Sequence, residues 1–388
     1  MKKDTSVVRQ NLGVDISKDS LEVVFSTIDI QQYVKVKASR SFSNSTAGFK
    51  QLQQWLEAKK VAGVEIGILL EATGIYYEQL AWHLHQKGYK LSVILPTKAK
   101  RYLQATGNKS KNDKMDAKGL ARMGLEQRLP LWQPLSENIY RLRLLTRQLE
   151  DFNNQRTVCL NQLHALQHSA YPVKEVERNL KKVLLSLEKG ILGLEGAITA
   201  LIEQDEKLWA RVEKITAIKG VGIKTVAVLL AETNGFATFE NQGQLVSYTG
   251  YDIVENQSGK KAATTRMSKK GNAHIRRAMH LPALGVVRFK EPAFVALYQR
   301  LIARGKTKMQ AYVAVQRKLL ILIWALWRKD EAYDPSFGQK ESSGNEEPKP
   351  LFSLGSEGDR KQVAPAIARA TQNELPCNES PEALFSLK

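Results

Sequence analysis

The sequence predicts an α/β domain at the N-terminus, followed by a mostly helical remainder. Short apolar runs alternate with stretches of helical periodicity over residues 8–130. Two leucine-rich segments at heptad spacing occupy residues 136–213. Glycine-containing turns then separate further helical stretches over residues 214–333. A segment rich in Pro, Ser and Glu over residues 335–388 is typical of a disordered tail.

The first domain begins with strands. Asn11–Asp15 and Leu21–Ser26 are predicted to pair as strands, with Val34–Ser41 as a third, because β-branched and apolar residues dominate these runs. Ser45 can cap a helix over Phe49–Lys60, whose large apolar residues share one face.

The same domain continues with single strands and helices in alternation. Glu65–Leu70 is predicted as a buried strand, Tyr77–Lys87 as a helix, and Lys90–Ile94 as a strand that stops at Pro96. Strands, helix, strand, helix and strand in this order are typical of the ribonuclease-H-like fold. A fold alone does not fix a function.

The central segment is predicted to form a coiled-coil hairpin of two helices that turn at Tyr171–Pro172. Arg156 is the polar residue that interrupts the first heptad series. The sequence leaves open whether this seam closes within one chain or between two. The heptad residues are Leu142, Leu145, Leu149, Phe152, Cys159, Leu163, Leu166, Leu180, Leu184, Leu187, Ile191, Leu194, Ile198 and Leu201.

A Gly-Val-Gly turn begins the third segment and matches a helix-hairpin-helix. Gly220 and Gly222 would let the backbone approach a phosphate, and the helix start at Lys224 and Thr225 would donate amide hydrogens to it. Such a contact does not depend on base sequence. An ordinary tight turn between helices is the alternative.

Ser258 precedes Gly259 in a polar loop that carries lysines. A serine in this setting could attack a phosphate, with the glycine permitting close approach and the cations stabilising the developing charge. The Ser-Gly pair is also common in loops without such a role. The basic residues expected to contact nucleic acid here are Lys260, Lys261, Arg266, Lys269, Lys270, Arg276 and Arg277.

Four carboxylates stand where strands end or a helix begins. Asp15 and Glu71 each end an apolar run, whereas Asp113 and Asp116 share one face at the start of a predicted helix. Carboxylates in such positions can converge on Mg²⁺, and two ions ~4 Å apart can hold the attacking and leaving oxygens of a phosphodiester. The alternative is that they are only turn formers and a helix cap.

The chain carries a formal net charge of +19 and has a pI of about 9.7, which favours a polyanionic partner such as nucleic acid. Lys114 and Lys118, beside the acidic pair, are candidate phosphate contacts. No membrane is expected, since the longest apolar run, Leu319–Trp327, is too short to span a bilayer. Two cysteines and a polar start without a visible secretory signal fit a reducing cytoplasm.

These residues resemble the DEDD-type transposases of bacterial insertion sequences, which pair a RuvC-like N-terminal domain with a serine-bearing C-terminal domain. The ordered set of motifs carries the resemblance, since each motif alone is common. The matching segments are Gly13–Lys18, Leu70–Gly74, Asn112–Ala117, Gly220–Thr225, Ser258–Gly259 and Met267–Gly271.

The resemblance implies that the four carboxylates hold Mg²⁺, with two ions expected, and that Ser258 attacks a DNA phosphodiester to form a covalent phosphoserine link. In such enzymes the serine of one protomer completes the acidic site of another, within a homodimer or tetramer on DNA. Some members are guided by a bridge RNA that pairs with donor and target DNA. This sequence departs from the family at Asp252–Ile253, where Thr-Pro is common, and Ser268 is a second hydroxyl nearby.

We expect a Mg²⁺-dependent DNA transposase or recombinase that works on the bacterial nucleoid. One alternative is a junction-resolving or structure-specific nuclease that uses metal-activated water. Another is a basic nucleic-acid-binding scaffold without catalysis. A sugar kinase is disfavoured, because such an enzyme has no use for the basic charge and the sequence has no P-loop motif.

Overall fold

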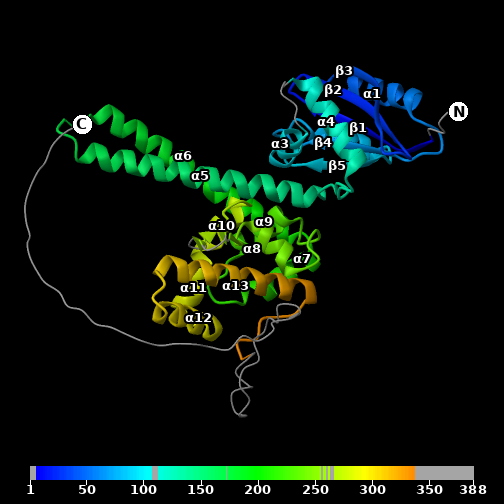
Figure 1. Cartoon of the computed structure of the whole chain (residues 1–388). Coiled ribbons are helices and arrows are strands. Elements are labelled where there is room, and N and C mark those ends of the chain that lie inside the picture. Colours follow the sequence, from blue (N-terminus) through cyan, green and yellow to red (C-terminus); the bar gives the residue numbers. More distant parts are fainter. Residues whose placement is uncertain are drawn as a thin grey trace, which may run out of the picture. The chain divides into compact units, whose positions relative to one another are not determined.

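Figure 1 shows the chain as a computed structural model. The predicted tail over residues 335–388 falls outside the described part from residue 337 onward. At residues 257–258 and 261–262 only the backbone is described. The structure describes residues 6–106, 112–171, 173–254, 257–258, 261–262 and 266–336.

Five strands form the N-terminal sheet in the order β3-β2-β1-β4-β5. β2 pairs antiparallel with β1 and β3, whereas β4 lies parallel to β1 and β5. This order and these directions confirm the predicted ribonuclease-H-like fold. The strands are β1 (Val7–Ile16), β2 (Ser20–Asp29), β3 (Val34–Ser43), β4 (Ile66–Glu71) and β5 (Lys90–Ile94).

Helices cover both faces of this sheet. Alternation along β1 places Leu12 and Val14 in one core with the buried residues of α1 and α2. Leu69 of β4 lies on the other face and packs with the buried residues of α3 and α4. The helices are α1 (Thr46–Lys59), α2 (Glu78–Gln86), α3 (Pro96–Ala105) and α4 (Asp113–Glu126).

Local signals explain where these helices begin. Ser45 caps α1 as predicted, since its hydroxyl accepts a hydrogen bond from the Gly48 N–H at 3.3 Å. α3 was not predicted from the sequence. Pro96 follows the end of β5, yet it also occupies the first turn of α3, where a missing N–H costs no hydrogen bond.

The central segment is a pair of long helices that pack along each other (Figure 1). Gly190 lies against the Phe152 ring, where an added Cβ would come within 2.5 Å of the ring. Arg156 faces Glu188 at 3.6 Å, so the polar interruption of the heptad series has a partner on the opposite helix. Pro172 lies outside the described residues. The helices are α5 (Glu137–Gln167) and α6 (Lys174–Glu203).

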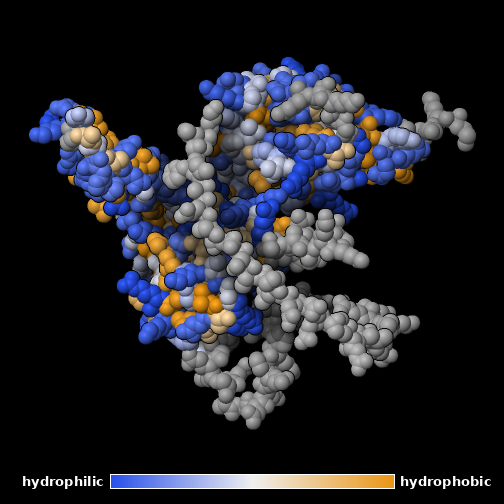
Figure 2. Space-filling model, turned by 60° about the vertical axis from the view of Figure 1, so that its left-hand side comes forward, coloured by the Kyte–Doolittle hydropathy of each residue, from blue (hydrophilic) through white to orange (hydrophobic). Residues whose placement is uncertain are grey.

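The heptad residues of α5 and α6 face each other within this one chain. Other large apolar side chains of the hairpin are exposed. On the face drawn in Figure 2, hydrophobic residues form small patches within a mostly hydrophilic surface. Exposed residues outside the series include Leu144, Leu160, Leu185 and Leu192. Buried heptad residues are Leu142, Leu149, Cys159, Leu163, Leu187, Ile198 and Leu201.

The remaining helices surround a second core. α13 is long and apolar enough to cross a membrane by length and composition alone. Its residues Val315, Leu319 and Ile323 are fully buried in the second core, so this face of α13 is taken up by packing. The helices are α7 (Glu206–Thr216), α8 (Ile223–Thr233), α9 (Gln242–Thr249), α10 (Ala273–Ala278), α11 (His280–Arg288), α12 (Pro292–Ala303) and α13 (Lys308–Lys329).

Candidate active site

Asp15 and Glu71 lie at the ends of two neighbouring strands. β1 and β4 run parallel with Val14 opposite Leu70, so the residues that follow come side by side. Side chains alternate along a strand, which turns both carboxylates toward the face that α3 and α4 cover. The sheet therefore presents two acidic groups together at the carboxyl ends of its strands.

α4 lies directly on β1 at Gly13. An added Cβ on Gly13 would stand 2.1 Å from the Ala121 nitrogen and 2.2 Å from the Ala117 oxygen, so the contact requires glycine. Two residues earlier on the strand, the Asn11 amide donates to the Ala121 carbonyl oxygen at 3.3 Å. The helix thus runs back along the strand, which carries its first turn toward Asp15.

Asp113 and Asp116 stand in this first turn, and Asp113 is not the helix cap. Asn112 caps α4, because its side chain accepts a hydrogen bond from the Met115 N–H at 2.8 Å. The alternative that Asp113 is only a capping residue is therefore wrong. The helix dipole favours negative charge in this first turn. Because Asn112 provides the cap, both carboxylates remain available to a ligand.

Electrostatic repulsion links all four carboxylates. Partial burial, followed by the charges of Asp113, Glu71 and Asp116, raises the pKa of Asp15 from 3.8 to about 6. The Ile16 N–H donates to Asp15 Oδ1 at 3.1 Å and opposes this rise only in part. Acidic groups that repel one another at a strand end are an arrangement that a divalent cation would relieve.

The donor set suits Mg²⁺, because carboxylate oxygens are the ligands that this ion prefers. In the described part of the chain, however, no three Asp, Glu, His or Cys side chains are grouped closely enough to hold one metal ion. As they stand, these carboxylates therefore do not form a metal site, and a shared ion would require their side chains to move. Lys114 and Lys118 are exposed on α4 and remain available as phosphate contacts.

We expect Mg²⁺ to stabilise the protein more at pH 7.5 than at pH 5. Folding raises the pKa of Asp15 to about 6, so its neutral form stabilises the fold below about pH 4, and this contribution is lost as the pH rises through 6. Partial exposure screens the effect, which limits the loss to about 1 kcal/mol. Thermal unfolding with and without Mg²⁺ at both pH values measures the difference. An equal Mg²⁺ effect at both values would contradict an acidic metal site at Asp15.

We expect Gly13→Ala to lower the free energy of unfolding by about 3 kcal/mol or more, because the new methyl group would meet the backbone of α4. Gly196→Ala is the matched control. It adds the same methyl group to a helix where nothing lies within 4 Å, and it should stabilise the protein by up to about 1 kcal/mol. Urea denaturation measures both changes. Equal stability of the two variants would show that α4 is not held against Gly13.

The segment that carries Ser258 extends between α9 and α10 as short paired strands. Ser258 in β7 lies opposite Lys261 in β8, while β6 pairs with β9. The side chains of Ser258 and Lys261, together with Gly259 and Lys260, lie outside what the structure describes. The strands are β6 (Ile253–Val254), β7 (Gln257–Ser258), β8 (Lys261–Ala262) and β9 (Arg266–Met267).

Close backbone contacts hold the base of this segment. Gly271 packs on Gly250, where an added Cβ would come within 2.5 Å of the Gly250 nitrogen. Arg276 donates to the Thr249 carbonyl oxygen at 2.7 Å. Arg276, which was predicted to contact nucleic acid, therefore also has a structural partner within the protein.

Sequence reasoning missed a buried acidic group beside this segment. Glu232 is 3% exposed and accepts hydrogen bonds from Arg147 (2.7 and 3.0 Å) and Asn272 (2.7 Å). Burial opposes ionisation, but these donors outweigh it and hold the pKa of Glu232 below its usual range. Asn272 also caps α10, so the network ties α5 to the helix that follows the serine segment. A lone Glu within an apolar helix was the available signal.

Two other predicted nucleic-acid contacts form ion pairs within the protein. Arg277 pairs with Glu150, and Lys224 pairs with Glu195 at 2.7 Å. Such exposed pairs contribute little stability, so a phosphate can compete for either cation. Basic residues of the serine segment that are exposed and form no ion pair with any described residue are Arg266, Lys269 and Lys270.

One side of the turn between α7 and α8 packs against α11. Gly220 has a φ of +98° and lies against Gly285 of α11, where an added Cβ would come within 2.9 Å of the backbone. This side of the turn is therefore covered. Gly222, the backbone cap of α8, has open space at its Cβ position, and Thr225 is half-buried one turn later. A phosphate contact is left only at this open side of the turn.

Comparisons with known proteins identify the chain as a DNA transposase or recombinase. A family profile described as a transposase matches residues 12–172, and the profile of the IS116/IS110/IS902 transposase family matches residues 212–299. The chain belongs to this transposase family.

Several named relatives resemble the chain over most of its length. The pilin gene-inverting protein of Moraxella lacunata is 31% identical over 326 residues, which cover 83% of this chain and 97% of that protein. The transposase of insertion sequence element IS1111A from Coxiella burnetii is 23% identical over 348 residues, covering 83% and 90%. A solved structure of Thermus thermophilus RuvC matches 32% of this chain and 99% of its own, with 10% identity and a TM-score of 0.25.

Proposed function

We propose that this transposase cuts DNA with Mg²⁺ held by Asp15, Glu71, Asp113 and Asp116, and that Ser258 is the nucleophile. The observation that carries the metal part is the raised pKa of Asp15, which arises from burial and the charges of the three other carboxylates. The adjacent ends of β1 and β4, and the packing of α4 on β1 at Gly13, support the convergence of these groups from distant parts of the chain. Two bound ions would stabilise charge on the attacking and leaving oxygens of the phosphodiester.

Ser258 would determine the kind of product. Its hydroxyl oxygen would bond to the phosphorus while the bond to one DNA oxygen breaks. The serine would lose its proton, and the released DNA end would gain one. The phosphodiester energy would be kept in the protein–DNA link, and the reverse attack by another DNA end could then join new partners. Attack by water would instead release two free ends, which is the nuclease alternative.

The proposal also covers how protomers assemble and how an RNA selects the DNA. The serine of one protomer is proposed to act at the acidic cluster of another, within a homodimer or tetramer. A bridge RNA is proposed to select donor and target DNA, while the protein contacts shape and backbone. The net charge of +19 supports binding to two polyanions. The inward-facing heptad series supports a coiled-coil hairpin within each chain, and the open side of the α7–α8 turn supports a helix-hairpin-helix contact with phosphate.

The test is incubation of the full chain with labelled DNA that carries the element ends, with Mg²⁺ and with the RNA transcribed from the flanking non-coding DNA. A DNA–protein adduct that survives a denaturing gel supports the proposal. Cleavage without an adduct would favour the nuclease alternative. Binding without any Mg²⁺-dependent breakage would favour the scaffold alternative.

A further inference from the structure

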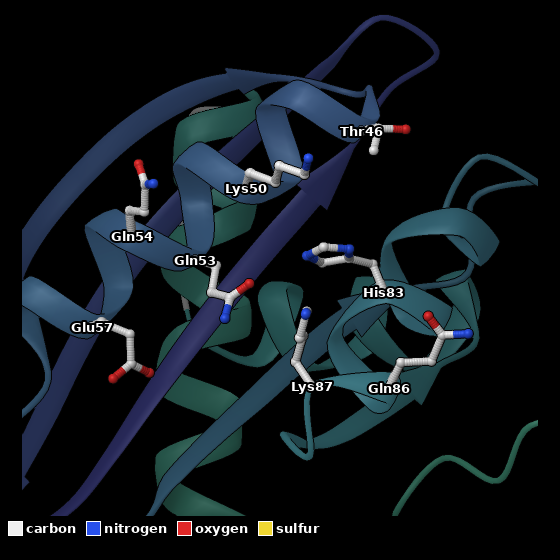
Figure 3. A pocket seen from close by; sticks show the side chains of 8 residues that line it. All are labelled: Thr46, Lys50, Gln53, Gln54, Glu57, His83, Gln86 and Lys87. Carbon is white, nitrogen blue, oxygen red and sulfur yellow. The ribbon is translucent and has the colours of Figure 1, made fainter.

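A solvent-open hollow of about 740 Å³ lies on the N-terminal domain between α1 and α2 (Figure 3). These helices cover the face of the sheet opposite to the one that carries Asp15 and Glu71. The hollow is therefore separate from the acidic cluster, and the proposed chemistry makes no use of it. Its lining residues are Thr46, Lys50, Gln53, Gln54, Glu57, His83, Gln86 and Lys87.

The residues that line the hollow are polar, and several of their side chains point toward its centre. Figure 3 shows the side-chain ends of Lys50, Gln53, His83 and Lys87 directed toward the same space. Lys50 and Gln53 lie one turn apart on α1, and Lys87, the C-cap of α2, follows His83 by four residues. Two amphipathic helices thus place donors from both sides around one opening.

The charge of the hollow is positive. Lys50 and Lys87 form no ion pair and no side-chain hydrogen bond with any described residue. Glu57 is the acidic residue of the lining, and it is already engaged by Lys60 and by the Tyr89 hydroxyl at 2.6 Å. The two free ammonium groups are therefore not neutralised within the described chain.

The positive charge of the hollow affects the pKa of His83. Its Nε2 atom is buried and has no hydrogen-bond partner within the described residues. Burial, followed by the Lys87 and Lys50 ammonium groups, lowers the pKa of His83 below its usual range. The Phe49 ring packs against the imidazole with its centroid 5.6 Å away. A buried imidazole nitrogen without a partner next to two free cations is a polar group that a bound ligand could satisfy.

We infer that this hollow binds a backbone phosphate of a nucleic-acid strand other than the strand at the acidic cluster. The two ammonium groups would supply the charge, and His83 and Gln53 would supply directed hydrogen bonds. DNA and RNA share this phosphodiester chemistry. The inference rests on the proposed function only in taking nucleic acid as the ligand, because the hollow and the carboxylates lie on different faces of the sheet.

The test uses the double variant Lys50→Gln/Lys87→Gln in the full chain. The matched control is Lys37→Gln/Lys59→Gln, which removes the same charge from exposed residues that do not line the hollow. Lys59 lies on α1 nine residues from Lys50, on the opposite side of the helix. Fluorescence anisotropy with EDTA measures the affinity for a single-stranded RNA and for a DNA duplex at several salt concentrations.

We expect the double variant to bind about tenfold more weakly than the control. The slope of log affinity against log salt should fall by about 0.9 for the duplex or about 0.7 for the single strand, since one phosphate contact is lost. Weaker binding of one probe alone identifies the bound strand as DNA or as RNA. Weaker binding of both probes shows that the hollow accepts either nucleic acid. Identical behaviour of variant and control with both probes would overturn the inference.

A second readout tests the direct contact at His83. The chain has six histidines, so selective histidine labelling gives a short set of NMR signals, which His83→Gln assigns. Binding of the probe should raise the pKa of His83, because the phosphate charge offsets that of Lys50 and Lys87. An unchanged His83 titration would overturn the inference. Cleavage is not measured in either experiment, so failure here leaves the proposed chemistry standing, and failure of cleavage leaves this site standing.

Discussion

Asp15→Asn is expected to lower the rate of DNA strand cleavage by about 10³-fold or more. The change keeps the size of the side chain but removes one charged oxygen donor, and loss of several kcal/mol of charge stabilisation corresponds to this factor. DNA binding should persist, because the basic surface is unchanged. Cleavage of labelled element ends in the presence of Mg²⁺ measures the effect.

The same variant should be more stable than the wild type when no divalent cation is present. The asparagine side chain would carry no charge, so the repulsion that raises the pKa of Asp15 would vanish. Asp19→Asn is the matched control, since Asp19 is an exposed carboxylate in the turn after β1 and is not part of the acidic cluster. Full cleavage by Asp15→Asn would remove the metal-site proposal. Equal loss in the control would show that general charge, and not the cluster, sets the rate.

Ser258→Ala is expected to abolish the covalent DNA–protein adduct while DNA affinity stays within about twofold. The variant lacks the proposed nucleophilic oxygen, so the phosphoserine link at this position cannot form. Denaturing gels measure the adduct, and anisotropy measures binding.

Ser268→Ala is the control for this experiment. The Ser268 hydroxyl accepts a hydrogen bond from the Lys270 N–H at 3.2 Å, which gives it a local structural role. We expect this variant to keep the adduct. An adduct that persists in Ser258→Ala and disappears in Ser268→Ala would move the nucleophile to Ser268, and one that persists in both would reject serine attack.

The sheet and the positions of Asp15 and Glu71 at its strand ends were predictable because their signals are local. Asp15 and Glu71 each follow an apolar run, and parallel strands bring such positions to one edge. The start of α4 was visible in Asn112 and the acidic pair, although Asn112 and not Asp113 turned out to be the cap. The spatial link between strand and helix depends on Gly13, whose partner Ala121 is far away in the sequence.

Several features could not be predicted from the sequence because they depend on contacts between residues that are far apart in the chain. α3 was missed because Pro96 signals the end of a strand and the start of a helix equally well. Arg276 and Gly220 were predicted to touch nucleic acid, and their packing against Thr249 and Gly285 becomes visible only in three dimensions. The grouping of His83 with Lys50 likewise required two helices to be placed together.

Because α4 packs on β1 at Gly13, the proposed metal site would be complete only in the assembled domain. Half of the acidic cluster arrives with the strands and half with a helix that reaches them only by lying flush on β1. A chain that has formed its sheet but has not docked α4 would lack half of the proposed metal-binding groups. An incomplete chain, or one whose α4 is transiently detached, would therefore not cut DNA by the proposed chemistry.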